Sequence, residues 1–459
     1  MNFAHQICWT LLNCLKPRST KFKNRKVTKM ETGIVILLAL IVVYTILGYA
    51  LGRVSITMPM FFVITGAIVG PNGLGWLSFG IDASQVETLT ELTLALLLFA
   101  DAATLNFNQV KDDAQMPGRL LGIGFPLTLL TGALVAYLLF PIEKIGFALL
   151  VSAILAPTDA ALGLPIFNNP HVPVRIRRAL NVESGLNDGL ATPLVTLFIA
   201  LALEEIAGGG KQYWALSAVS EIAIAAVVGI TLGLVGGWLF AQAVHKNWTS
   251  SVARQIGNPA LALLVFFTTK ALGGNGFVAV FVGGIMFAYI TRNVLHDAIE
   301  YTEVTGTFFS LFVWTIFGAV IAIPLMQDFN PMALLYAILS LTVVRMIPVA
   351  IAMIGTRLRK DTLLMMGWLG PRGLASVVFL IMANEAAHAA QVEIGLLTAT
   401  VGWTILLSVL LHGFSALPLA NWYSHRLESA SPEIPEMLEV SEPKSLRRKA
   451  FHADLLDRK

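Results

Sequence analysis

The sequence is poor in charge and in cysteine. Asp, Glu, Lys and Arg make up only 13% of the 459 residues, whereas 56% are hydrophobic, a balance unlike that of soluble domains. Cys8 and Cys14 both precede the first long apolar segment, which excludes a disulfide framework or a cysteine metal site in the apolar part. The formal charge of +3 is too small to indicate nucleic-acid binding. No P-loop pattern is present, so we expect neither nucleotide hydrolysis nor a cofactor.

Long apolar segments occupy most of the chain. Each has about 17–25 residues, the length that a helix needs to cross ~30 Å of hydrocarbon. We predict thirteen spans, at residues 33–51, 56–72, 86–106, 120–140, 145–164, 180–203, 214–242, 258–273, 275–291, 303–324, 331–355, 361–384 and 392–420. Short loops separate them. The fold class is therefore an all-α, polytopic membrane protein.

Lysine and arginine are concentrated in alternate loops. The loops after spans 1, 3, 5, 7, 9 and 11 carry twelve of them, whereas the other loops carry Lys144 and Lys211. The twelve are Arg53, Lys111, Arg119, Arg175, Arg177, Arg178, Lys246, Arg254, Arg292, Arg357, Arg359 and Lys360. By the positive-inside rule we expect these loops and the C-terminus in the cytoplasm, with the protein in a bacterial inner membrane.

The two ends differ from the middle. Residues 1–29 carry seven positive charges that would have to cross the membrane in this topology. We therefore interpret them as a basic extension and Met30 as the natural start. Residues 30–424 form the predicted transmembrane domain. Residues 425–459 mix charges with Pro and Ser, which is typical of a mostly disordered cytoplasmic tail.

Six ionisable residues near the middle of predicted spans are good candidates for a function. An ionisable side chain at the bilayer centre costs ~3 kcal/mol on insertion scales, so each is a functional candidate. They are Asp101, Asp159, Glu183, Asp188, Arg345 and Arg372. Four acids and two bases in an apolar setting require partners within the protein.

The sixth span carries two polar pairs at helical spacing. Glu183 and Asn187 are four residues apart, as are Ser184 and Asp188, and the second pair is rotated from the first by about 100°. One helix can thus offer a structural stripe and a neighbouring ion-facing stripe. For Glu183, a buried ion pair with Arg345 and a direct transport role both remain open. For Asp188 we favour ion binding.

Two spans are interrupted at matching places. Proline and glycine break helical propensity at residues 156–159 in span 5 and at 370–373 in span 12. These spans are seven apart, as an inverted repeat of spans 1–6 and 8–13 would place them, and paired broken helices indicate a transporter's ion site. If the half-helices cross, Asp159 would compensate positive helix ends and Arg372 negative ones. A simple proline kink is the alternative.

Six motifs in order resemble those of the NhaP-type sodium/proton antiporters of the cation:proton antiporter superfamily. They are LLLFADA, APTDAALG, ESGLNDGLATP, GNGFVAVFVGG, Arg345 followed by Pro348, and GPRGLASVVF, and the resemblance covers residues 31–420. It implies thirteen helices in which a core bundle moves against an interface bundle, usually in a homodimer. After APTD many relatives have Pro-Val, where this chain has Ala160-Ala161.

The resemblance also implies roles for individual residues. Asp188 would bind cation and proton alternately, and Asp159 would support it, so that the two hold Na⁺ transiently. Thr158 and Ser184 would contribute oxygens. The supporting residues would be Asn187, Glu183, Arg345 and Arg372, with Asp101 less directly involved.

We therefore expect a secondary antiporter and not an enzyme. Its partners would be protons, monovalent cations and the lipid bilayer, with Na⁺ or Li⁺ the favoured ions. The Asn-Asp pair favours electroneutral exchange, because family members with that pair often exchange one for one. A K⁺/H⁺ antiporter of the same fold and a cation channel are alternatives. A membrane aspartyl protease fits less well, because Asp188 follows Gly-Leu-Asn and not Gly-x-Gly.

Overall fold

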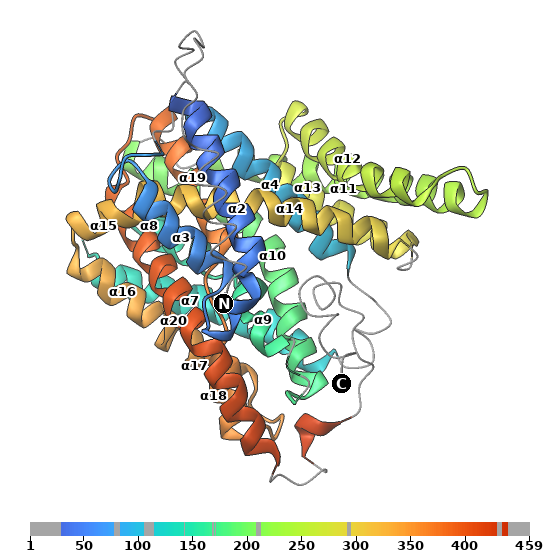
Figure 1. Ribbon diagram of the computed structural model, residues 1–459. Coiled ribbons are helices and arrows are strands. Elements are labelled where there is room, and N and C mark those ends of the chain that lie inside the picture. The colour runs from blue at the N-terminus through green and yellow to red at the C-terminus, as the bar shows by residue number, and fades with distance from the viewer. Residues whose placement is uncertain are drawn as a thin grey trace, which may run out of the picture.

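The computed structural model describes residues 29–77, 83–104, 114–141, 143–167, 169, 171–207, 213–291, 295–428 and 434–438. Every regular element in these ranges is helical, which confirms the predicted all-α fold (Figure 1). The expectations for the basic N-terminal extension and for most of the C-terminal tail concern residues outside these ranges.

The helical segments correspond to the predicted spans in order. The first six spans are α2 (Lys29–Arg53), α3 (Met58–Val69), α4 (Ala83–Ala103), α6 (Gln115–Arg119) with η1 (Leu120–Gly124) and α7 (Phe125–Leu139), α8 (Ile145–Leu155) with α9 (Ala160–Phe167), and α10 (Val174–Ala207). The seventh is α11 (Tyr213–His245). The rest are α12 (Ser251–Ala271), α13 (Gly276–Thr291), α14 (His296–Phe317) with η2 (Gly318–Ala322) and α15 (Ile323–Gln327), α16 (Pro331–Leu341) with α17 (Val343–Ala352), α18 (Lys360–Trp368) with α19 (Leu374–Ala389), and α20 (Gly395–Glu428).

Seven of these segments among the described residues are long and apolar enough to cross a membrane as one helix. Four apolar helices are shorter: α3, α8, α13 and α19. The short length of α8 and α19 has a local cause, because each is one half of an interrupted span. Both interruptions fall where proline and glycine predict them, at 156–159 and 369–373.

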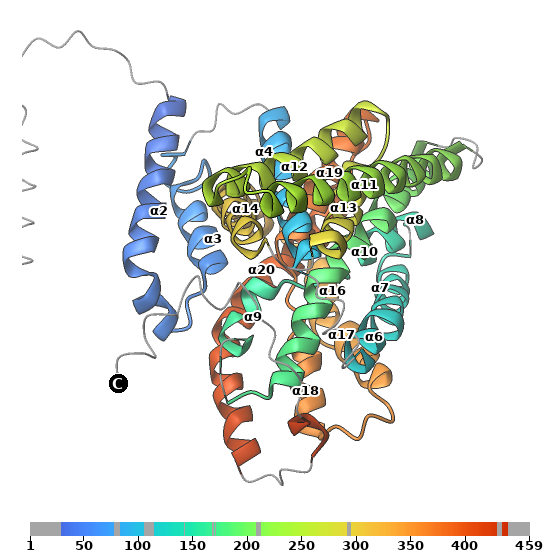
Figure 2. The same cartoon turned by 90° about the vertical axis from the view of Figure 1, so that its right-hand side faces the viewer.

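The helices pack in two groups on either side of α10. Among the closest packing pairs, α4 packs against α13 and α14, and α11 against α13, whereas α7 packs against α8 and α16 against α20. Figures 1 and 2 show α11, α12 and α14 together, apart from α16, α17, α18 and α20. Helix α10 packs against α8 on one side and against α4, α11 and α13 on the other, so its polar face lies where the two groups meet.

The N-terminal end of α10 differs from the sequence prediction. The sequence assigns Arg175, Arg177 and Arg178 to a loop, but all three lie in the first turns of α10 and are buried. Arg177 Nε donates to the carbonyl oxygen of Val172 (2.9 Å), and Arg175 donates to that of Pro435 (2.7 Å). A span predicted from hydropathy stops at the first charged residues. The helix itself extends further, because other parts of the protein provide hydrogen-bond partners for those charged side chains.

Candidate functional site

The two interrupted helices meet at their breaks. The backbone N–H of Asp159 donates to the carbonyl oxygen of Pro371 (2.8 Å), so the extended segments of the two spans are hydrogen-bonded to each other. The Ser376 hydroxyl, at the start of α19, donates to the carbonyl oxygen of Ile154 near the end of α8 (2.7 Å). Backbone groups released by the breaks are thus satisfied by protein, as the low-dielectric setting requires.

Asp159 caps two helices at once. Its Oδ1 accepts a hydrogen bond from Ala161 N (2.7 Å), in the first turn of α9, and its Oδ2 accepts one from Leu374 N (3.0 Å), the first residue of α19. Both helices therefore direct their N-terminal, positive ends at one carboxylate. These contacts agree with the compensating role that the sequence predicts for Asp159.

Gly373 is required for this close approach. A Cβ atom built at position 373 would overlap the Asp159 side chain, including Oδ2, Cβ and Cγ. Gly370 is equally constrained, because its Cβ would overlap Nε of Arg345. Glycine at these two positions therefore lets the α18–α19 connection pass against both a carboxylate and a guanidinium.

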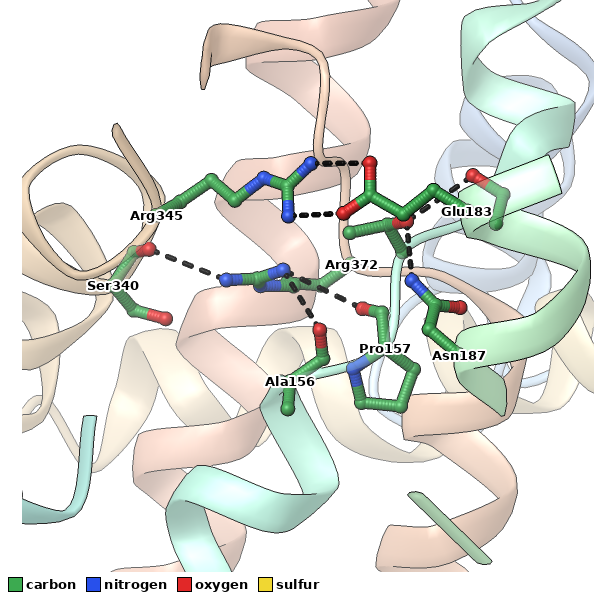
Figure 3. Close-up of polar contacts among 9 residues, drawn as sticks. Ala156, Pro157, Glu183, Asn187, Ser340, Arg345 and Arg372 are labelled. Carbon is green, nitrogen blue, oxygen red and sulfur yellow. Dashed lines mark hydrogen bonds and ion pairs between the residues drawn. The ribbon is translucent and has the colours of Figure 1, made fainter. Parts of the chain in front are cut away.

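Arg372 lies at the opposite, negative helix end. Its buried guanidinium donates to the carbonyl oxygens of Ala156 (3.4 Å) and Pro157 (3.5 Å), which follow the last residue of α8, and to that of Ser340 in α16 (3.5 Å) (Figure 3). A cation is stabilised at a helix C-terminus, where carbonyl groups have no partner within the helix. Asp159 and Arg372 thus occupy opposite electrostatic ends of the crossing.

Glu183 and Arg345 form a two-pronged ion pair. Arg345 Nη1 lies 2.6 Å from Glu183 Oε1, and Nη2 lies 2.8 Å from Oε2 (Figure 3). Both side chains are only 2% exposed. With both carboxylate oxygens bonded to a buried guanidinium, Glu183 has no oxygen free to exchange ions with water. The geometry therefore favours the structural interpretation of Glu183.

The α10 face next to Asp188 is joined to the break in span 5. Asn187 Nδ2 donates to Thr158 Oγ1 (2.7 Å), and Thr158 Oγ1 shares a hydrogen bond with Ser184 Oγ (3.1 Å). All three side chains are buried. The amide oxygen of Asn187 accepts no hydrogen bond from any described residue. Helix α10 thereby fixes Thr158, and with it the adjacent Asp159, beside the turn that carries Asp188.

Exposure separates the carboxylates into two kinds. Asp101, Asp159 and Asp188 are all partly exposed, whereas Glu183 is buried. Asp101 reaches the site from α4, because a Cβ at Gly185 of α10 would lie 3.9 Å from the Asp101 Cβ. The predicted site residues therefore gather around α10, with Asp101 contributed by the other helix group.

This arrangement offers oxygen ligands. Within the described ranges, no group of three or more His, Cys, Asp or Glu is placed to hold a metal ion. A cation here would need hydroxyl, amide, backbone or water oxygens in addition to carboxylates, a ligand set that suits a hard alkali cation.

Several site residues escape the sequence analysis. Ser376 and Ser408 are common in membrane helices and give no spacing signal, and Gly373 is significant only through the close approach of Asp159. His412 could have been found, since it is an ionisable residue inside an apolar segment.

Comparison with known proteins identifies a matching family and several relatives. The family described as "Sodium/hydrogen exchanger, transmembrane" matches residues 20–422. The K(+)/H(+) antiporter NhaP2 of Shewanella oneidensis is 26% identical over 234 residues, which is 51% of this chain and 40% of that protein. The Na(+)/H(+) antiporter of Schizosaccharomyces pombe is 24% identical over 404 residues, 78% of this chain and 83% of that one. The chain thus spans less than half the length of some curated relatives.

The fold also matches a solved structure. The sodium proton antiporter MjNhaP1 from Methanocaldococcus jannaschii at pH 8 superposes with a TM-score of 0.68 at 20% sequence identity. The superposition covers 83% of this chain and 98% of that one. At this level of identity the likeness establishes the fold alone.

Proposed function

This chain belongs to the sodium/hydrogen exchanger family, and on that premise we propose that it is a secondary antiporter. It exchanges a monovalent cation, Na⁺ or Li⁺, for H⁺ by competition at the carboxylate of Asp188. Asp159, Thr158 and Ser184 support the bound ion, and Asn187 and the Glu183–Arg345 pair hold the surrounding helices in place.

One observation carries the assignment: Asp188 is partly exposed, and each neighbouring polar side chain is bonded to another group of the site. Thr158, Ser184 and Asn187 are hydrogen-bonded to one another. Glu183 is bound to Arg345 through both oxygens. Asp159 caps two helices, so its charge is needed where it lies. Asp188 is then the carboxylate of this group best suited to exchange its partner without dismantling the fold.

Coupling follows from the cost of an uncompensated charge. A carboxylate in a partly dehydrated site is stabilised either by a proton or by a cation. If both loaded forms move between the two sides of the membrane and the empty, charged form does not, each cation that crosses in one direction requires a proton in the other. The opposing ion gradient supplies the energy.

The neighbouring amide supports electroneutral exchange. Asn187 occupies the position before Asp188 and cannot carry a proton, so one titratable group is present in the Asn-Asp pair. One proton exchanged for one monovalent cation moves no net charge. Membrane potential is then expected to leave the rate of exchange unchanged.

K⁺ is the alternative cation. Some relatives are named K(+)/H(+) antiporters, including those of Shewanella oneidensis and Alkalimonas amylolytica, whereas the Schizosaccharomyces pombe relative is named for Na⁺. Oxygen ligands alone do not separate these ions, because selectivity depends on cavity size and ligand number.

The remaining features of the proposal concern the whole molecule. The protein is multi-pass, and the charge asymmetry of its loops supports a cytoplasmic C-terminus in a bacterial inner membrane. We further propose that it acts as a homodimer and as a transporter without enzymatic activity.

The test uses inside-out vesicles from a host lacking its own antiporters. A pH gradient is established, Na⁺, Li⁺ or K⁺ is added, and the recovery of a quenched pH-sensitive dye is followed. We expect a cation-dependent recovery that Asp188→Asn abolishes, because an amide neither binds a proton nor balances a cation. The matched control is Asp328→Asn, which removes an exposed carboxylate after α15. An undiminished response in Asp188→Asn would contradict the assignment, and the most effective cation identifies the substrate.

A further inference from the structure

The break in span 12 leaves polar backbone groups without helical partners. Helix α18 ends at Trp368 and α19 begins at Leu374. The last carbonyl groups of α18 and the N–H groups of the connecting residues cannot form the usual bonds within a helix. Part of this demand is met locally, since Gly370 N donates to the carbonyl oxygen of Trp368 (2.8 Å).

Two side chains of α20 supply further partners. The backbone N–H of Arg372 donates to Ser408 Oγ (2.6 Å), and His412 Nε2 lies 2.8 Å from the carbonyl oxygen of Trp368. Ser408 and His412 are four residues apart, so they lie on one face of α20. Both are buried, at 0% and 1% exposure. One helix face therefore contacts the break on both of its sides.

Trp368 is held by α20 through its ring as well. The imidazole of His412 stacks on the indole with centroids 4.9 Å apart and planes inclined by 25°. The indole Nε1–H donates to Ser415 Oγ, also on α20 (2.8 Å). The last residue of α18 is thus fixed at its carbonyl, its ring and its indole nitrogen by a single neighbouring helix.

The proton positions follow from the partners. Both ring nitrogens face a backbone carbonyl oxygen that can only accept, and a neutral imidazole carries one N–H, so it can donate to only one of the two. We assign the proton to Nε2, whose contact with the Trp368 carbonyl oxygen is the shorter, at 2.8 Å. Nδ1 then faces Ser408, whose hydroxyl oxygen lies 3.4 Å away and whose carbonyl oxygen lies 3.0 Å away. The Ser408 hydroxyl accepts from Arg372 N and can direct its own proton toward Nδ1. The two bonds from Arg372 N to Ser408 and from His412 Nε2 to Trp368 thus join α20 to both sides of the break.

We propose that His412, acting with Ser408, is a positioning residue for transport: it sets the geometry of the α18–α19 break and hence the position of Arg372. The Arg372 guanidinium reaches the carbonyl oxygens after α8, and the Pro371 carbonyl accepts from Asp159 N. Displacing this connection displaces the support on which Asp159 and the site rest. This inference deepens the proposed antiport function and rests on it.

Exchange assays with two replacements test the role. In inside-out vesicles, His412→Ala is expected to lower the maximal exchange rate about tenfold, because a buried donor to a helix end is lost. His412→Gln keeps an N–H donor at this position, so its maximal exchange rate is expected to stay within about twofold of the wild-type rate. The control is His388→Ala, an exposed histidine at the far end of α19.

The pH profile separates positioning from titration. If His412 acts by positioning the connection and not by gaining or losing a proton, replacing it with glutamine, which does not titrate, leaves the pH dependence of exchange unchanged. We therefore expect His412→Gln to keep the wild-type pH profile. A shifted profile would overturn the proposal, as would wild-type rates in His412→Ala. A folded His412→Gln protein as impaired as the alanine variant would overturn it too. If the alanine variant does not fold, the glutamine variant decides alone.

A second measurement does not depend on transport. Amide hydrogen exchange of residues 368–374 in the purified protein is expected to quicken in His412→Ala and to stay unchanged in His412→Gln and His388→Ala. Unchanged exchange in His412→Ala would contradict the positioning role. Absence of cation-dependent exchange in the wild-type protein, with faster amide exchange in His412→Ala, would instead refute the proposed function and leave the contact established.

Discussion

At the scale of single residues, the site distinguishes acids by what their oxygens already bind. Glu183 and Asp188 are five residues apart on α10, yet the first is closed off by Arg345 and the second is partly exposed. A buried carboxylate bonded through both oxygens to a guanidinium contributes to the fold, whereas the carboxylate of a partly exposed residue can exchange one partner for another. Side-chain surroundings, and not residue type, separate the two roles.

The Glu183–Arg345 pair makes a stability prediction. Glu183→Gln leaves the Arg345 charge buried without its counterion, which costs about 3–5 kcal/mol. We expect a large fall in the melting temperature of the detergent-solubilised protein. Asp297→Asn is the control, because the Arg254–Asp297 pair in the first turns of α12 and α14 is partly exposed, at 21% and 33%. Exposed pairs contribute about 0–1 kcal/mol, so its removal is expected to change the melting temperature little.

Comparable melting temperatures in the two variants would show that the buried pair does not brace the helices. In that case the open alternative for Glu183, direct participation in ion exchange, would regain support. Vesicle assays on Glu183→Gln would then decide it.

At the scale of elements, the two interrupted helices form one electrostatic unit. Asp159 receives the N-termini of α9 and α19, and Arg372 meets the carbonyl groups after α8. Neither half-helix end could remain unpaired in the apolar interior, since each unsatisfied backbone group costs several kcal/mol there. Asp159 and Arg372, which stabilise the crossing of the two interrupted spans, therefore also form a polar site within the apolar interior.

Gly373 provides a test of this unit. Gly373→Ala places a methyl group on the Asp159 side chain, so the carboxylate must leave its capping position or the connection must move. We expect loss of cation-dependent exchange in a protein that still inserts in the membrane. Gly395→Ala is the matched control, because a Cβ at the start of α20 meets no atom within 4 Å. Wild-type exchange by Gly373→Ala would show that the contact between Asp159 and α19 is dispensable.

The sequence predicts well those features of the elements that depend only on the residues of a single segment. Span positions follow from apolar length, and both interruptions follow from proline and glycine within the span. For Glu183 the sequence leaves the pairing with Arg345 and a direct transport role both open, and the side-chain contacts favour the pairing. His412 and Ser408 could not be placed in this way, since their role depends on which face of α20 lies against Trp368 and Arg372. Packing between helices distant in sequence determines that contact.

At the scale of the whole molecule, the site lies where two helix groups meet. Asp188 belongs to α10, and Asp101 of α4 lies close to Gly185 of the same helix. Helix α4 packs with α13 and α14 (Figure 2). A polar site at such a junction can face either side of the membrane if one group moves against the other. This arrangement fits the moving core and interface bundles that the family resemblance implies.

The C-terminal tail shows what average composition does not predict. The tail composition is typical of disorder, yet residues 434–438 contact the body of the protein. Glu436 is buried and accepts hydrogen bonds from Arg359 N (2.7 Å) and the Thr362 hydroxyl (2.8 Å). A short segment can dock on the protein through one well-placed carboxylate even when the residues around it are polar. The average composition of the tail does not predict this contact.

The central claim is that cation and proton compete for Asp188, and proton release on cation binding tests it most directly. Purified protein in a weakly buffered solution at a pH where the site holds its proton is titrated with Na⁺, and the pH change is recorded. The account predicts release of about one proton per bound cation in the wild type, because the two ligands exclude each other at one carboxylate. It predicts no release in Asp188→Asn. Equal proton release from the variant, or cation binding by the wild type without proton release, would contradict the account.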